Sequence, residues 1–175
     1  VGVLEPDVAL AYGVSGASLR GSGVNWDIRK ATPYSGYEKY DFDVPLGEHG
    51  DVYDRYRVRI LEMSESRKII LQALDGLPEK GVFRSDNRKF VPPPRSDLGT
   101  SMEAVIHHFK LWTEGFDAPD EEVHVSVESP RGEITCYLHG TGGPKPRRVH
   151  FKTPSFMHIA AMPVVSEGLL LADMV

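Results

Sequence analysis

The sequence feature that most constrains the fold is a long helical pattern from Asp51 to about Leu77. Apolar side chains recur there at steps of three, four and seven residues with charges between them; they are Tyr56, Ile60, Met63, Ile70, Leu74 and Leu77. Asp51 and Asp54 suit the positive end of a helix dipole, and Gly76-Leu77-Pro78 is a typical helix end. At about 1.5 Å per residue, this helix is about 40 Å long. We therefore expect it to continue past a local core into a larger assembly.

Two dissimilar segments flank this helix. Residues 1–50 are rich in glycine and aromatic residues but have neither the G-x-G-x-x-G dinucleotide fingerprint nor a following Gly-Lys-Ser/Thr. We expect a packed irregular segment, whose aromatic residues cover a core or a subunit surface; they are Tyr34, Tyr37, Tyr40 and Phe42. On the other side, residues 78–99 are expected to form a loop that three consecutive prolines stiffen.

The second half of the chain carries both helix and strand patterns. Thr100-Ser101-Met102-Glu103 matches a capping box with Thr100 as N-cap, and predicts a helix to Gly115. Its apolar face would carry Met102, Val105, Ile106, Phe109 and Trp112. Alternating apolar residues then predict a three-stranded antiparallel meander with turns at Pro130-Arg131-Gly132 and at residues 140–144, followed by a helix beyond Pro154. The predicted class is α+β.

Composition excludes several classes of protein. A chain of 175 residues, 41% of them hydrophobic, suits one domain with a core, and a net charge of −5 argues against nucleic acid as a partner. The single cysteine, Cys136, excludes an internal disulfide framework and an iron–sulfur cluster or zinc site built from this chain's thiolates alone. No apolar run approaches the roughly 20 residues of a membrane-spanning helix.

The ends of the chain suggest a fragment. The sequence begins at Val1 without a methionine and stops after an apolar stretch, residues 169–175. A natural terminus is usually more polar. We therefore expect this chain to be a piece of a longer protein.

The neighbouring histidines His107 and His108 resemble a metal site only superficially. Adjacent helical residues point about 100° apart, whereas the helical zinc motif uses i, i+4 spacing. Glu103 and His107 have that spacing, but no third ligand is evident. The favoured interpretation is an ion pair between Glu103 and His107 beside a half-buried His108. A metal-dependent enzyme using these three residues stays a further hypothesis.

The segment Ser129-Pro130-Arg131-Gly132-Glu133 is the candidate site. Proline and glycine predict a hairpin turn, while two carboxylates, Glu128 and Glu133, bracket Arg131. A buried guanidinium needs partners, and these two carboxylates are the obvious ones, although strand alternation leaves their faces open. No residue is assigned as catalytic and none as a metal ligand.

Three long blocks closely resemble one family. They are LRGSGVNWDIRKATPYSGYEKYDFDVPLGEHGDVYDRYRVRILEM, TSMEAVIHHFKLWTEG and ESPRGEITCYL. They resemble the D subunit of proton-pumping NADH–quinone oxidoreductase, respiratory complex I, and the resemblance runs through essentially all residues. It implies a subunit that forms part of the quinone-reduction cavity wall, beside the subunit with the terminal iron–sulfur cluster. Related quinone oxidoreductases that use coenzyme F420 or ferredoxin share much of the pattern, so the electron donor stays open.

This family is related to the large subunit of nickel–iron hydrogenases, which implies a hydrogenase-large-subunit-like fold. Residues 1–175 would be the C-terminal part of a single such domain, without its N-terminal half and extreme C-terminus. In the hydrogenases a Pro/Ala-Arg-Gly segment places an arginine over the metals, and residues 129–133 resemble that segment. The hydrogenases' metal-binding cysteine pairs have no counterpart here. The residues expected to face the quinone cavity or the cluster are therefore Arg131, Gly132, Glu133 and Glu128.

The resemblance also implies cofactors and partners. Quinone would be the substrate of the whole complex, this chain would bind no cofactor, and FMN and iron–sulfur clusters would belong to partner subunits. The partners would be the iron–sulfur cluster subunit and the membrane quinone-channel subunit, with this chain peripheral on the cytoplasmic side of the cell (inner) membrane. The isolated fragment is expected to be inactive. Two questions stay open. Arg131 either stabilises negative charge on reduced quinone or on the cluster, or only ties the hairpin to adjacent helices. The chain either forms part of the quinone-cavity wall or is an assembly fragment with no chemistry of its own.

Overall fold

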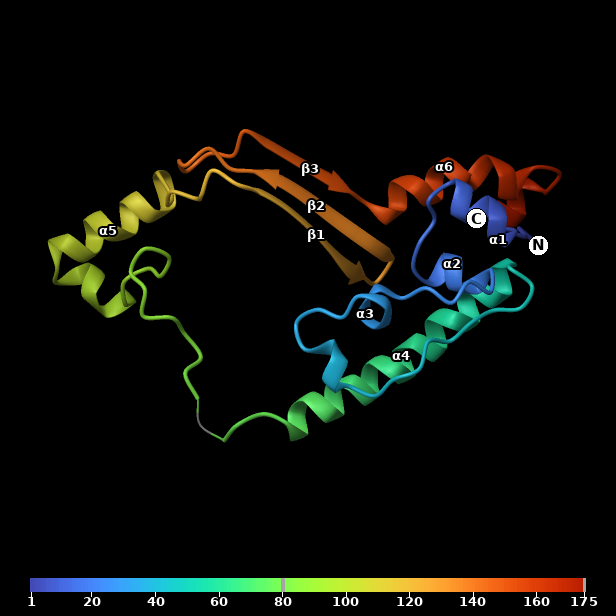
Figure 1. Cartoon of the computed structure of the whole chain (residues 1–175), viewed down its shortest axis with the longest axis horizontal. Helices are drawn as coiled ribbons and strands as arrows, with labels where there is room; N and C mark the ends of the chain where they lie inside the picture. The colour runs from blue at the N-terminus through green and yellow to red at the C-terminus, as the bar shows by residue number, and fades with distance from the viewer. Residues whose placement is uncertain (80, 175) are drawn as a thin grey trace. The chain divides into compact units, whose positions relative to one another are not determined.

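The computed structural model describes residues 1–79 and 81–174 and shows helices together with one small sheet (Figure 1). The helices are α1 (Pro6–Ala11), α2 (Ala17–Gly21), α3 (Ile28–Ala31), α4 (Val52–Asp75), α5 (Met102–Thr113) and α6 (Pro154–Ser166). The strands are β1 (Glu122–Ser129), β2 (Gly132–His139) and β3 (Arg148–Lys152). Short 3-10 turns occur at η1 (Tyr37–Lys39), η2 (Arg95–Gly99) and η3 (Leu171–Met174). The predicted α+β class is confirmed.

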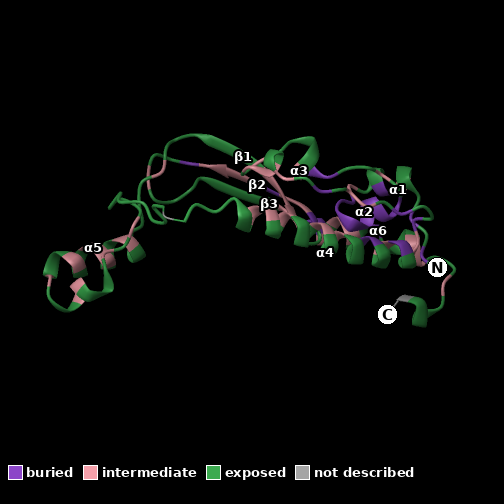
Figure 2. Cartoon of the chain, turned by 90° about the horizontal axis from the view of Figure 1, so that it is seen from below, coloured by how far each residue is buried: buried purple, intermediate pink, exposed green. Residues whose placement is uncertain are grey.

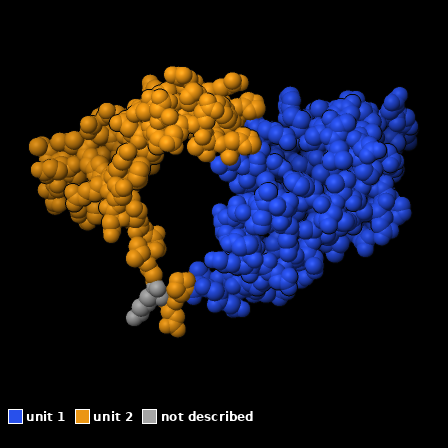
Figure 3. Space-filling model, in the orientation of Figure 1, with its two compact units in different colours: residues 1–77, 125–136, 151–175 blue, residues 78–124, 137–150 orange. Residues whose placement is uncertain are grey.

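The chain divides into two compact units (Figure 3). Unit 1 comprises residues 1–77, 125–136 and 151–175, and unit 2 comprises residues 78–124 and 137–150. The strands form one sheet in the order β1-β2-β3, so the predicted meander is confirmed. The hairpin turn between β1 and β2 belongs to unit 1, and the loop between β2 and β3 belongs to unit 2. The expected single domain over residues 1–175 stays a prediction.

The core of unit 1 lies in the glycine-rich first segment. Figure 2 shows the buried residues concentrated around α1, α2 and α6, and the central cluster consists of Leu4, Ala9, Val14, Leu19 and Ala161. The expected irregular segment thus forms three short helices, because its small residues allow close contact between backbones. Gly16 has φ of +69°, and a Cβ atom there would collide with the backbone of Gly132.

The aromatic residues of this segment form a packed cluster. The Tyr37 ring meets those of Tyr34, Tyr40 and Phe42 edge-on at centroid distances of 5.1, 6.4 and 6.4 Å. Phe42 is buried, and the guanidinium of Arg29 lies 5.1 Å from its ring centroid. These residues therefore cover the interior of unit 1, as expected.

Helix α4 confirms the long predicted helix, and the Asp51 side chain caps it by accepting a hydrogen bond from the Asp54 amide at 2.9 Å. Its apolar stripe, however, does not face this chain. The six stripe residues are exposed, from 42% for Ile60 to 64% for Leu77. The buried residues of α4 are Asp54 and Val58, which lie on another face. The stripe is consistent with the expected continuation into a larger assembly.

Polar side chains on the inner face of α4 hold the preceding segment. Asp54 accepts hydrogen bonds from the amides of Glu48 and His49 at 2.8 and 2.6 Å, and these bonds lower the pKa of its carboxyl. The Gln72 amide bonds the backbone of Asp41 in both directions, at 2.8 and 2.7 Å. An extended segment has unpaired backbone groups, and this helix supplies their partners. The segment that precedes α4 is thus held on this helix by polar contacts.

The start of α5 corrects the predicted capping box by one residue. Ser101, not Thr100, is the N-cap, and its hydroxyl accepts from the Ala104 amide at 3.3 Å. The same hydroxyl donates to Glu103 at 3.1 Å. The helix ends before Gly115, which has φ of +80°. Its expected apolar face, like that of α4, consists of exposed residues, and none of the residues that the structure describes in α5 is buried.

The remaining predictions on the second half hold. Helix α6 begins at Pro154, as expected after the last strand, and continues past an internal proline, Pro163. Cys136 lies in β2 as a free, partly buried thiol. None of the helices in residues 1–79 and 81–174 is long and apolar enough to cross a membrane.

Candidate functional site

The Pro130–Arg131 turn is a tight two-residue connection between β1 and β2. The Ser129 hydroxyl donates a hydrogen bond to the Gly132 carbonyl oxygen at 2.7 Å, which links the two residues that flank the turn. Gly132 is buried and has φ of +135°, a conformation that favours glycine. The predicted turn is confirmed, and its tightness leaves the Arg131 side chain exposed at its tip.

Neighbouring elements hold this hairpin on several sides. The Glu128 amide donates to the Tyr34 hydroxyl at 2.9 Å, and the Glu133 amide donates to the Ser15 hydroxyl at 3.0 Å. The Trp26 indole donates to Glu133 Oε2 at 3.4 Å. The backbone of Gly16 lies against that of Gly132, as the fold requires. These contacts fix the turn without any contribution from the side chain at its tip.

The buried guanidinium of unit 1 belongs to Arg20 on α2, not to Arg131. Arg20 is 3% exposed, and its Nε donates to Glu62 Oε1 at 2.6 Å. Its Nη2 donates to Glu128 Oε1 at 2.9 Å and its Nη1 to the Trp26 carbonyl at 3.0 Å. The expected pairing of Arg131 with Glu128 and Glu133 is therefore wrong. The turn directs Arg131 outward, while both carboxylates lie on strands and meet α2 and Trp26 instead.

A second ion pair completes what we call the Arg20 cluster, which consists of Arg20, Asp27, Arg29, Glu62 and Glu128. Arg29 donates to both carboxylate oxygens of Asp27, at distances between 2.6 and 3.2 Å. Asp27 Oδ2 also lies 3.8 Å from Arg20 Nη1. Three carboxylates thus share two guanidiniums in one largely buried group.

Two of the three carboxyls of this cluster, those of Asp27 and Glu128, differ in the direction of their pKa shifts. Burial by itself would raise the pKa of Asp27, but the hydrogen bonds and charge of Arg29, with the charge of Arg20, outweigh it and lower that pKa. For Glu128, burial dominates and raises the pKa, because the charge and hydrogen bond of Arg20 only partly compensate. The cluster therefore holds one carboxyl firmly ionised and another closer to protonation.

A cavity of about 450 Å³ adjoins this cluster and the hairpin turn. Its walls combine charged, hydroxyl and apolar side chains: Arg20, Arg29, Arg59, Glu62, Met63, Ser66, Glu128, Ser129 and Pro130. Such a lining can hold water or a polar ligand and can exchange protons with it. Of the four predicted site residues, Glu128 lines this cavity, Gly132 and Glu133 lie in the adjoining strand, and Arg131 is exposed beside them.

The sequence did contain a signal for the residues that were missed. Arg20 lies in GASLRGSG, a run otherwise composed of small and apolar residues, and all five residues of α2 are buried. A lone charge in such a run has to find buried partners. Asp27 and Glu62 could not be matched to it from the sequence, because these contacts depend on how α2 packs against the start of α3 and against α4.

The histidine pair does not form the expected contacts. The His107 ring bonds the Arg88 carbonyl at 2.7 Å, while Glu103 bonds Ser101, so the predicted ion pair between them is wrong. His108 is half-buried, as expected, beside the Trp112 ring at a centroid distance of 6.1 Å. Within the part of the chain that the structure describes, no three His, Cys, Asp or Glu residues lie close enough to hold a metal ion.

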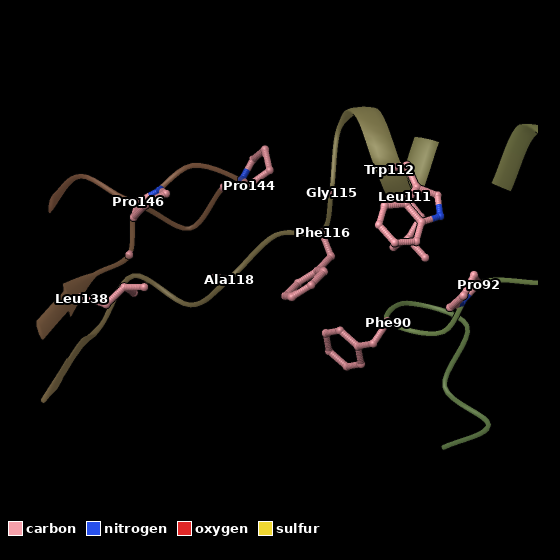
Figure 4. A pocket seen from close by; sticks show the side chains of 12 residues that line it. Phe90, Pro92, Leu111, Trp112, Gly115, Phe116, Ala118, Leu138, Pro144 and Pro146 are labelled. Atoms are coloured by element: carbon pink, nitrogen blue, oxygen red, sulfur yellow. The ribbon is translucent and has the colours of Figure 1, made fainter. Parts of the chain in front are cut away.

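Unit 2 has its own apolar cavity of about 510 Å³, shown in Figure 4. Aromatic, aliphatic and proline side chains line it, among them Phe90, Leu111, Trp112, Phe116, Leu138 and Pro144. Its described lining includes no ionisable side chain. This cavity suits apolar contact and offers no group for acid–base chemistry.

Comparison with known proteins gives a consistent result. The sequence profile described as "Respiratory-chain NADH dehydrogenase, 49 Kd subunit" matches residues 1–175. The chain is 54% identical to an NADH-quinone oxidoreductase D subunit of Herpetosiphon aurantiacus, over 100% of the chain and 42% of that protein. It is 56% identical to "NADH-quinone oxidoreductase subunit 4" of Thermus thermophilus, with the same shares covered. The corresponding identity with the NADH-quinone oxidoreductase D subunit of Rickettsia bellii is 48%, over 100% of the chain and 44% of that protein. The chain therefore spans about two-fifths of the length of these curated relatives.

Proposed function

Because the chain belongs to the family of the 49 Kd subunit of respiratory-chain NADH dehydrogenase, we propose that it works as part of an NADH–quinone oxidoreductase. Within that complex it forms part of the wall of the quinone-reduction cavity. The observation that carries the proposal is the match of this family over residues 1–175, supported by relatives at about half identity whose names contain this activity.

The proposed reaction is the reduction of a quinone to a quinol, which takes two electrons and two protons. FMN and iron–sulfur clusters in partner subunits would deliver the electrons, and this chain would bind no cofactor itself. Its partners would be the iron–sulfur cluster subunit and the membrane subunit that admits the quinone. The chain would be peripheral, on the cytoplasmic side of the cell (inner) membrane. In this proposal residues 1–175 are the C-terminal part of a single hydrogenase-large-subunit-like domain.

Arg131 is the residue of this chain that we assign to the quinone cavity. Its turn is fixed by Ser15, Tyr34 and the backbone of Gly16, so the hairpin does not need Arg131 as a tie. An exposed charge on a rigid turn is suited to a ligand outside unit 1. A guanidinium there stabilises the negative charge that develops on a quinone during reduction, and a positioned donor of this kind contributes strongly when water is excluded.

The test is Arg131→Ala in the assembled complex. We expect quinone reductase activity to fall at least about tenfold, with normal assembly, because the cavity loses a fixed positive charge. Arg131→Lys keeps the charge and should retain most activity, and Arg57→Ala, which removes an exposed arginine from α4, is the matched control. Wild-type activity of Arg131→Ala in a normally assembled complex would remove the cavity role.

A second candidate function is assembly without chemistry. The exposed apolar faces of α4 and α5 favour it, since such faces are typical of surfaces that other chains cover. In this alternative Arg131→Ala has full activity, whereas charged substitutions at Ile60 or Phe109 prevent assembly. A complex that uses coenzyme F420 or ferredoxin as electron donor is distinguished by assaying each donor with membranes that contain the protein.

A further inference from the structure

The carboxyl of Glu128 is only half satisfied. Its side chain is 6% exposed, and Oε1 accepts the hydrogen bond from Arg20 Nη2 at 2.9 Å. Among the described residues, no hydrogen bond reaches its other oxygen, Oε2. A buried carboxylate normally has partners on both oxygens, because an ionised group in a low-dielectric site is costly. No buried side-chain oxygen of the described residues lacks a partner, so Oε2 is accessible, and Glu128 lines a cavity from which this oxygen can take up a proton.

Of the three carboxylates in the Arg20 cluster, that of Glu128 has its negative charge least compensated by the arginines. From α4, Glu62 takes the shorter bond of Arg20, at 2.6 Å. Asp27 is held by Arg29 through both carboxylate oxygens. Glu128 receives only the remaining Nη2 bond of Arg20, and the nearby negative charge of Asp27 outweighs the positive charge of Arg29. Two guanidiniums cannot neutralise three carboxylates, so one carboxyl binds a proton more readily than a fully paired one does.

The other polar groups around Glu128 do not change this balance. From α4, Arg59 lines the same cavity but is exposed, and its guanidinium bonds the Arg55 carbonyl at 3.2 Å and the Ser18 hydroxyl at 3.5 Å. Tyr34 reaches the backbone amide of Glu128 and not its carboxyl. Solvent screens the charge of an exposed arginine, which makes it a weak substitute for a buried partner.

We propose that Glu128 is a proton-exchanging residue, which binds a proton on Oε2 and exchanges it with the cavity beside the Pro130–Arg131 turn. This cavity, of about 450 Å³, has room for several water molecules, and the hydroxyls of Ser66 and Ser129 line it together with Glu128. The direction of the pKa shift, upward through burial, agrees with this role. A chain of waters in such a cavity would connect the carboxyl to solvent or to a bound ligand.

The role of this proton in the reaction rests on the proposed function. Quinone plus two electrons and two protons gives quinol. Protonated Glu128 would supply one of those protons through cavity water, become a carboxylate held by Arg20, and take up a new proton from solvent. The electrons come from the partner subunits, so the residue itself undergoes no redox change.

The direct test is infrared difference spectroscopy of the assembled complex across a pH series. We expect a carbonyl band of a protonated carboxyl that titrates above the ordinary range of glutamate, disappears in Glu128→Gln and shifts in Glu128→Asp. Glu38→Gln, which alters an exposed carboxylate of η1, should leave the band unchanged. A band that persists in Glu128→Gln, or the absence of any such band, would overturn the proposal whatever the activity of the complex.

The second measurement is the pH profile of quinone reduction by the same variants. The wild-type rate should fall as pH rises through the pKa of Glu128, because the proton donor is lost, and Glu128→Gln should lower the rate about 100-fold and remove that limb. Glu128→Asp should restore part of the rate with a shifted limb. Glutamine can still accept the hydrogen bond from Arg20, so the complex with Glu128→Gln should assemble normally. If it does not assemble, both the infrared measurement and the pH profile are made on Glu128→Asp.

These outcomes separate the two proposals. A titrating band that Glu128→Gln removes, combined with an unchanged rate, supports the proton site and contradicts its part in reduction. Loss of activity in Arg131→Ala together with no Glu128 band supports the quinone-cavity function and overturns the proton site. A lost band and a lost pH limb in the same variant support both.

Discussion

The first 28 residues differ from helices α4 and α5 in how far their side chains are buried. The first segment is rich in glycine and serine, yet it supplies most of the buried core of unit 1. Helices α4 and α5 have clear apolar stripes, yet every stripe residue is exposed. Periodicity indicates that a helix forms and which face it offers. It does not indicate that the same chain covers that face.

Close contact within unit 1 depends on small residues and on paired charges. Glycines allow backbones to meet where larger side chains would not fit, and the Arg20 cluster then joins α2, α4 and β1. The apolar residues of the α4 and α5 stripes, in contrast, are exposed.

The largest effect is expected where two glycine backbones meet. Gly16→Ala should destabilise the fold by about 4 kcal/mol, because the new Cβ collides with Gly132 and Gly16 has a positive φ. Gly99→Ala is the matched control, since nothing lies within 4 Å of a Cβ atom there. Urea unfolding of both variants measures the difference. Equal stability would mean that the close approach of residues 16 and 132 is not part of the fold.

The next effect concerns the buried charge. Arg20→Ala leaves Glu62 and Glu128 without their shared partner and should cost about 3 kcal/mol of the free energy of unfolding. Arg131→Ala removes an exposed guanidinium and should change stability by less than about 0.5 kcal/mol. Denaturation curves of the two variants give the comparison directly. If Arg131→Ala lowered the free energy of unfolding more than Arg20→Ala, Arg131 would be the arginine that stabilises the fold.

A smaller effect distinguishes the two faces of α4. Val58 is 1% exposed, and Val58→Ala should cost about 2 kcal/mol through lost burial. Ile60→Ala, two residues further on, should cost less than about 0.5 kcal/mol in the chain alone, because Ile60 is 42% exposed. In the assembled complex the cost of Ile60→Ala should rise, because its face is then covered. An effect of Ile60→Ala confined to the isolated chain contradicts this assignment of faces.

The smallest effect separates two neighbouring residues at the start of α5. Ser101→Ala removes the N-cap and should cost about 1 kcal/mol, whereas Thr100→Ala should be close to neutral. Thermal unfolding followed by circular dichroism is sufficient for this pair. If Thr100→Ala proves the more harmful, the capping box begins at Thr100 after all.

The fold class, the long helix, the meander and its turns were predictable because each has a local signature. Asp51 before α4 and Pro130-Arg131-Gly132 between two alternating stretches specify their structures through neighbouring residues alone. The candidate site was predicted only in part. Glu128 was identified, but its partner Arg20 lies 108 positions away in the sequence, and no local pattern links them. The two inferred ion pairs, of Arg131 and of His107, failed because other groups are the partners of these side chains. Arg20 and Trp26 bond the two carboxylates of the hairpin, and the Arg88 carbonyl bonds the His107 ring.

The order of residues was enough to specify the helices, the hairpin and the family, since these depend on short-range preferences and on long recognisable blocks. Tertiary packing determines which arginine is buried and which is exposed at a turn. That choice depends on how α2 packs against α4 and on the two-residue turn that directs Arg131 outward. The physical reason is that burial of a charge is a property of its whole surroundings. Arg20 and Arg131 both precede glycine, and only their neighbours in space separate a structural ion pair from an exposed charge.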